Sequence, residues 1–175
     1  PFSDVDLLFL TPYKLTAWGE SVVESTLYIL WDLKMKIGHA TRTVEECIRL
    51  AGSDLTIRTA LLESRFLYGD AELAETLDAQ LWKQLFKSTG PEFVALKLEE
   101  REARHKKQGA TRFLLEPNVK EGKGGLRDLQ TLYWITKYLS GAKLPSEMIY
   151  AGYFTTTEYA SFDQAENFLW TVRCH

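Results

Sequence analysis

Two aspartates separated by one residue stand at the head of an apolar run, where Asp4 and Asp6 precede Leu7 to Leu10. Alternate side chains of a strand point to one face, so both carboxylates would point the same way. Two like charges about one pleat apart repel, and a divalent cation such as Mg²⁺ neutralises both through carboxylate oxygens. The pattern indicates a metal site, and we expect Asp32 to add a third carboxylate from the adjacent strand. Two ions held there could activate an attacking hydroxyl and stabilise a leaving pyrophosphate.

The same three aspartates also fit purely structural roles. Asp4 could cap a turn, Asp6 could pair with a lysine, and Asp32 could end a helix. Two aspartates at this spacing occur often by chance, so both interpretations stay open at this point.

A second motif is the glycine-rich stretch that precedes Asp128. Its glycines at 122, 124 and 125 permit positive φ and would let backbone N–H groups approach an anion at the start of the next helix. The spacing is not that of a Walker motif. Candidate contacts for a nucleotide or a protein substrate are Lys34, Lys120, Gly124, Gly125 and Arg127. The alternative is a tight interdomain turn in which Arg127 or Asp128 forms a structural ion pair.

The elements that must position these residues follow an α+β pattern. Residues 3–10 are predicted to be a buried strand, residues 12–28 a helix, and residues 31–37 a half-buried strand that carries Asp32 and ends at Gly38-His39. A capping box at Thr43–Glu46 and a leucine at every fourth position from 73 to 85 begin a helical region. We expect residues 1–88 to form a small α/β region and residues 89–175 a helical bundle, with a soft boundary near 88–91.

Other candidates carry less weight. His39 and Arg42 could face the carboxylate site, although a turn histidine with a local hydrogen bond is the more common case. His105 has no acidic or thiol partner at metal-ligand spacing, which argues against zinc. Aromatic residues on helical stripes are interpreted as core: Tyr133, Trp134, Phe168 and Trp170.

Net charge, hydrophobicity and cysteine content restrict the partners and the cellular compartment that we expect. The 175 residues carry a net charge of −3, so no overall positive field draws the chain to nucleic acid. No run approaches the roughly 20 apolar residues that span a bilayer, so we expect no membrane partner. The two cysteines, Cys47 and Cys174, lack a disulfide framework and fit a reducing cytoplasm.

Three stretches carry a resemblance to one family. SDVDLLFL, beginning at Ser3, resembles the metal-binding strand of the DNA polymerase β-like nucleotidyltransferases. LWDLKMKIGHATRTVEEC, beginning at Leu30, and LEPNVKEGKGGLRDLQTLYWI, beginning at Leu115, are similar to one branch of that superfamily. This branch is the bifunctional uridylyltransferase/uridylyl-removing enzyme of the nitrogen regulatory protein P-II, the GlnD family.

The resemblance implies a partial polymerase β-like nucleotidyltransferase sheet followed by a helical bundle, and transfer of UMP from UTP to a tyrosine of P-II with Mg²⁺. Asp4 and Asp6 would hold the metals, and Asp32 would be the third carboxylate and the general base or its electrostatic support. The family places a Gly-Gly or Gly-Ser phosphate loop upstream of Asp4, and this chain begins after it. We therefore expect an inactive part of the transferase, with glutamine acting as an effector only through domains absent here.

Two alternatives remain. The glutamine synthetase adenylyltransferases share the fold and a Gly-Gly-x-Arg-Asp stretch like that at 124–128. The sequence of residues 115–120, Leu-Glu-Pro-Asn-Val-Lys, nevertheless favours the uridylyl branch. The second alternative is that the chain is a non-catalytic regulatory binding module of the same fold.

Overall fold

The structure is a computed structural model that describes residues 5–108, 118–142 and 145–175. The chain divides into two compact units, residues 1–85 and residues 86–175, and each unit is described by itself. Asp4 lies outside the described residues.

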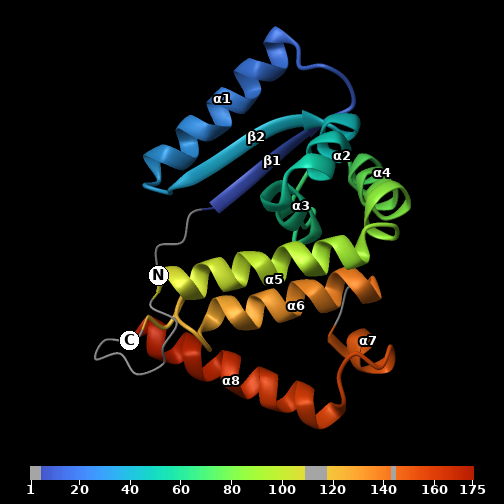
Figure 1. The fold of residues 1–175 in the computed structure, drawn as a ribbon. Coiled ribbons are helices and arrows are strands. Elements are labelled where there is room, and N and C mark those ends of the chain that lie inside the picture. The colour runs from blue at the N-terminus through green and yellow to red at the C-terminus, as the bar shows by residue number, and fades with distance from the viewer. Residues whose placement is uncertain (1–4, 109–117, 143–144) are drawn as a thin grey trace. The chain divides into compact units, whose positions relative to one another are not determined.

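The first unit is built on two parallel strands joined by a helix (Figure 1). Strand β1 (Val5–Thr11) pairs with β2 (Ile37–Thr43) from Val5 opposite Ile37 to Thr11 opposite Thr43, and helix α1 (Ala17–Asp32) connects them. Parallel strands need such a crossover. Helices α2 (Val44–Ser53), α3 (Leu55–Leu62) and α4 (Ala71–Leu81) follow. Helix and strand together confirm the α+β class.

Local capping explains why the helices of this unit begin where they do. Thr43 and Glu46 form the predicted capping box of α2, with Glu46 N–H donating to Thr43 Oγ1 at 3.3 Å and Thr43 N–H donating to Glu46 Oε2 at 3.0 Å. Asp54 and Asp70 cap α3 and α4 through their carboxylates alone, which accept from backbone N–H groups of the first turn. Arg58 is only 2% exposed and donates to the carbonyl oxygens of the last turn of α2.

The predicted second strand was misplaced. Helix α1 continues to Asp32, since Leu33 N–H donates to Ile29 O and Met35 N–H to Leu30 O. Lys34 then adopts a left-handed φ of 61°, which ends the helix, and β2 begins only at Ile37. The alternation of apolar and polar residues over 31–37 therefore falls on a helix end and a turn, and Gly38 and His39 lie inside the strand.

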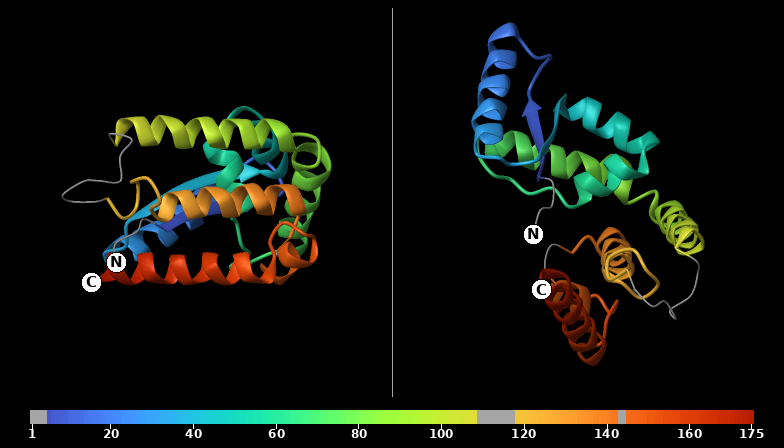
Figure 2. Two further views of the ribbon diagram at one scale, coloured as in Figure 1. Left: turned by 60° about the horizontal axis from the view of Figure 1, so that its bottom comes forward. Right: turned by 90° about the vertical axis from the view of Figure 1, so that its left-hand side faces the viewer.

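The second unit is helical. It contains α5 (Gly90–Lys107), α6 (Leu126–Ser140), α7 (Pro145–Tyr150) and α8 (Thr156–Cys174), while the π-helical turn η1 (Trp82–Phe86) contains the boundary between the units. Helix α6 packs against α5, α7 and α8, and it lies between α5 and α8 in the left-hand view of Figure 2. Tyr138 is the centre of this core, stacked on Phe93 at 3.9 Å between ring centroids and bonded through its hydroxyl to Thr89 at 2.6 Å.

One expectation about the apolar core was wrong. Phe168 and Trp170 on α8 are 65% and 40% exposed, so neither belongs to the core. On α1, Leu27 is buried while Trp18 is 78% exposed. Both helices carry large apolar residues on more than one face, and periodicity alone does not tell which face is covered. Among the described residues, no helix is both long and apolar enough to cross a membrane.

Candidate functional site

Asp6 lies on β1, as predicted, with its side chain exposed. Its neighbour in register on β2 is Gly38, and a Cβ placed on Gly38 would collide with Asp6 Oδ1. The absence of a side chain at Gly38 therefore leaves room for the Asp6 carboxylate beside the neighbouring strand. Sequence reasoning missed this role of Gly38, because the strand was expected to end there.

Asp32 is the last residue of α1 and is exposed, so it does not lie on the second strand. Its position matches the alternative interpretation, that of a helix-end residue. Lys34 is exposed in the turn that follows. Among the residues that the structure describes, no group of three His, Cys, Asp or Glu side chains could hold a metal ion. The metal-binding roles of Asp4, Asp6 and Asp32 stay predictions.

The glycine-rich stretch folds into a turn that uses its own amides. The side-chain oxygen of Asn118 accepts from the amides of Lys120 and Glu121, and its carbonyl oxygen accepts from the amide of Gly122. The amides of residues 124–128 also donate within the stretch. A Cβ on Gly125 would lie 2.6 Å from Val119 O, so the turn excludes larger residues. Those amides are already occupied, so an anion here would have to be held by side chains such as Lys120.

Asp128 fastens this turn to α5. Its carboxylate accepts from Gly124 N–H at 2.8 Å, forms an ion pair with the Arg104 guanidinium, and lies 2.9 Å from His105 Nε2 through both oxygens. Burial by itself raises the pKa of Asp128, but the Gly124 amide, Arg104 and His105 together outweigh it and the pKa is lowered. The structural interpretation of the motif is thus confirmed for Asp128.

Arg127 is also engaged in structural contacts. Its guanidinium donates to Gln130 at 2.9 Å and to Glu121 at 3.4 Å, and it lies 5.7 Å from the ring centroid of Trp134. The acidic partner of His105 was missed, since Asp128 is 23 positions away and no local spacing reveals it.

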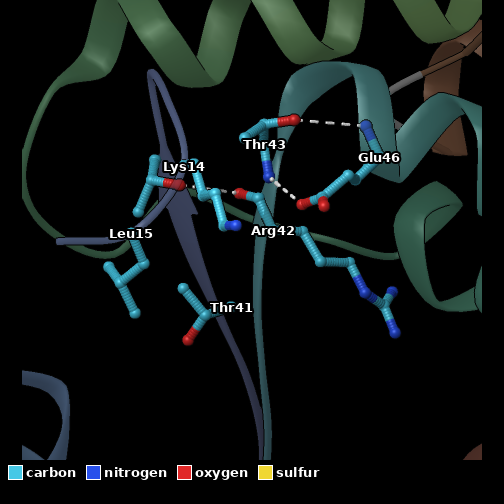
Figure 3. Close-up of a pocket in the computed structure, with 7 residues that line it drawn as sticks. Lys14, Leu15, Thr41, Arg42, Thr43 and Glu46 are labelled. Atoms are coloured by element: carbon cyan, nitrogen blue, oxygen red, sulfur yellow. Dashed lines mark hydrogen bonds between the residues drawn. The ribbon is translucent and has the colours of Figure 1, made fainter. Parts of the chain in front are cut away.

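A separate small pocket of about 150 Å³ lies where β1 and β2 end and α2 begins (Figure 3). Arg42, which sequence analysis placed near the carboxylates, belongs to β2 and lines this pocket, whereas His39 is an exposed strand residue. The lining residues are Thr11, Lys14, Leu15, Thr41, Arg42, Thr43 and Glu46.

Comparisons with known proteins decide the family. A family model described as GlnD PII-uridylyltransferase matches residues 92–175. A bifunctional uridylyltransferase/uridylyl-removing enzyme of Cereibacter sphaeroides is 63% identical over all 175 residues, and one of Ruegeria pomeroyi is 64% identical over the same length. The chain belongs to the bifunctional uridylyltransferase/uridylyl-removing enzyme family.

Within this family, the chain spans 19% of the length of each of these two relatives. No solved structure matches it. The matched region covers all 175 residues and therefore includes both units.

Proposed function

We propose that this chain contributes part of the site that transfers UMP from UTP to a tyrosine of P-II in the cytoplasm. The observation that carries the proposal is the 63–64% identity, over the whole chain, to enzymes named for uridylyl transfer and removal. The exposed Asp6 carboxylate beside the side-chain-free Gly38 supports it, since a nucleotidyl transfer needs accessible carboxylates on a fixed scaffold.

The residues present fit a magnesium ion in part. Asp6 offers hard carboxylate oxygens of the kind Mg²⁺ prefers, and Gly38 leaves room beside them. Asp4 and Asp6 would hold the ion, with Asp32 as the proposed third carboxylate from the end of α1. When bound, Mg²⁺ would supply charge neutralisation for the triphosphate.

The chain's own groups have simpler tasks in this proposal. Asp6 is held in register opposite Gly38 by the β1–β2 pairing, which sets the face of the sheet from which its carboxylate projects. Asp32 would accept the proton of the attacking tyrosine hydroxyl or support the group that does. Lys34, two residues beyond Asp32 in an exposed turn, would lie near the negative charge of the nucleotide.

The test is uridylyl transfer to P-II by the full-length enzyme carrying Asp6→Asn. Removal of one charged group that acts on the transferred phosphoryl should lower kcat by at least about a hundredfold. The matched control is Glu75→Gln, which removes an exposed carboxylate on α4 of the same unit. Both variants should melt within a few degrees of the parent. Retention of more than a tenth of the activity in Asp6→Asn would remove Asp6 from the site.

A further inference from the structure

The pocket at the carboxyl ends of β1 and β2 takes no part in the proposed carboxylate site. Thr11, at the end of β1, lies five positions beyond Asp6, which at the rise of a strand is about 16 Å. In open α/β sheets, ligands bind beyond the carboxyl ends of parallel strands. The pocket therefore lies where sheets of this kind bind their ligands.

The pocket contains hydrogen-bond donors that are not paired with an acceptor among the described residues. Lys14, in the segment between β1 and α1, has no ion pair among the described residues. Thr43 Oγ1 is instead engaged at the start of α2, where it accepts from Glu46 N–H. Lys14 and Thr41 lie on one side of β2, while the guanidinium of Arg42 points away from them (Figure 3). The Thr43 hydroxyl points towards α2, away from Lys14 and Thr41 (Figure 3), so Lys14 and Thr41 are the groups placed to contact a ligand.

Charge and size select the class of ligand. The lining has two cations, Lys14 and Arg42, and one carboxylate, that of Glu46, whose Oε2 already accepts from Thr43 N–H at 3.0 Å. The net charge of the lining is therefore positive. A volume of about 150 Å³ is about five times the share of one water molecule in the liquid, which is room enough for a phosphate-sized group.

We propose that this pocket binds an oxyanion of phosphate size, with the Lys14 ammonium and the Thr41 hydroxyl as its donors. The oxyanion is either free phosphate or a phosphate group of a nucleotide that extends outward from the pocket. Arg42 contributes positive potential without a direct contact.

The experiment follows the backbone amide signals of the ¹⁵N-labelled chain during separate titrations with inorganic phosphate, UTP and, at matched ionic strength, sodium chloride. Phosphate or UTP should shift the amides of Thr41 and Thr43 in a saturable manner, and chloride should not. Shifts by both ligands identify any phosphate group as sufficient, and shifts by UTP alone identify the nucleotide as the source.

Lys14→Met tests the assignment of the donor, because it keeps the apolar stem and removes the charge. It should raise the dissociation constant at least about tenfold, as expected for loss of a charge-assisted hydrogen bond. Lys83→Met, on the exposed face of η1, is the control and should bind like the parent. Equal binding by Lys14→Met and the parent, or no shift at millimolar phosphate and UTP, would overturn the proposal. Loss of activity on Asp6→Asn leaves these titrations unaffected, so the two proposals fail separately.

Discussion

Replacement of Asp128 by asparagine should destabilise the helical unit substantially. The substitution keeps the size of the side chain and removes the charge that Arg104 and His105 face. The Arg104 side chain is only 11% exposed, and its next carboxylate, Glu121 Oε2, lies 3.9 Å from its Nε. Breaking a buried pair costs about 3–5 kcal/mol, and a charge-assisted hydrogen bond contributes about 1.5–3 kcal/mol. Since the Asp128 side chain is 18% exposed and asparagine can still accept from Gly124, we expect a loss of about 2–3 kcal/mol at pH 7.

The pH dependence of this loss has a definite sign. The pKa of Asp128 is lowered in the folded chain from its ordinary value of 3.8, so the folded state favours the carboxylate more than the unfolded state does. Its contribution is complete above the unfolded pKa and disappears as the pH falls through the folded pKa. The difference between the parent and Asp128→Asn should therefore be constant near neutrality and shrink below about pH 4.

The assay is urea unfolding monitored through amide hydrogen exchange in α5 and α6, because a chain of two units need not unfold in a single transition. The matched control is Asp163→Asn on the exposed face of α8, where the carboxylate bonds only to Asn167 among the described residues, at 3.1 Å. That control should change the free energy of unfolding by less than about 0.5 kcal/mol. If Asp128→Asn matches the control at pH 7, or if its deficit is undiminished in acid, the Asp128 carboxylate does not hold the turn to α5.

Two further predictions concern packing. Gly125→Ala should lower the free energy of unfolding by about 2 kcal/mol or more, because its Cβ would press on the carbonyl oxygens of Val119 and Gly122. Gly52→Ala, with open space around the new methyl group, should instead be neutral or stabilising by about 0.5–1 kcal/mol, and equal effects would contradict the close contact. In the native chain, an aromatic disulfide reagent should titrate Cys174 rapidly and spare Cys47. Cys47 is fully buried, and burial raises its pKa to about 11. Two rapid thiols would mean that α2 opens readily.

The parts of the fold that could be predicted from sequence are those governed by neighbours in the chain. The capping box of Thr43 and Glu46 is a local pattern, and it marked the start of α2 correctly. The end of α1 was not predictable in this way, because the turn depends on a left-handed φ at Lys34, a residue type that gives no signal for it. The short helix α7 (Pro145–Tyr150) was also missed, since six residues are too few for a helical period to emerge.

The candidate sites show the same difference between features set by neighbours in the chain and contacts between distant residues. Asp6 was placed on its strand by the short unbroken apolar run that follows it, a local property. The contact of Asp128 with Arg104 and His105 joins residues 23 and 24 positions apart. Such a contact depends on how α5 and α6 pack, which no spacing in the sequence encodes.

The two units carry different kinds of support for a transferase. The family model matches residues 92–175, which lie in the helical unit. There, the polar groups of the glycine-rich turn are mostly engaged with one another: Arg127 with Gln130 and Glu121, Asp128 with α5, and the amides with the turn itself. In the first unit, Asp6 and Lys14 are exposed, and no ion pair engages either within the described part of the chain. Groups that already satisfy one another stabilise a fold, whereas accessible unpaired charges can respond to a ligand. We therefore expect the ligand-responsive groups of this chain around β1 and β2, while the contacts of the glycine-rich turn stabilise the helical unit.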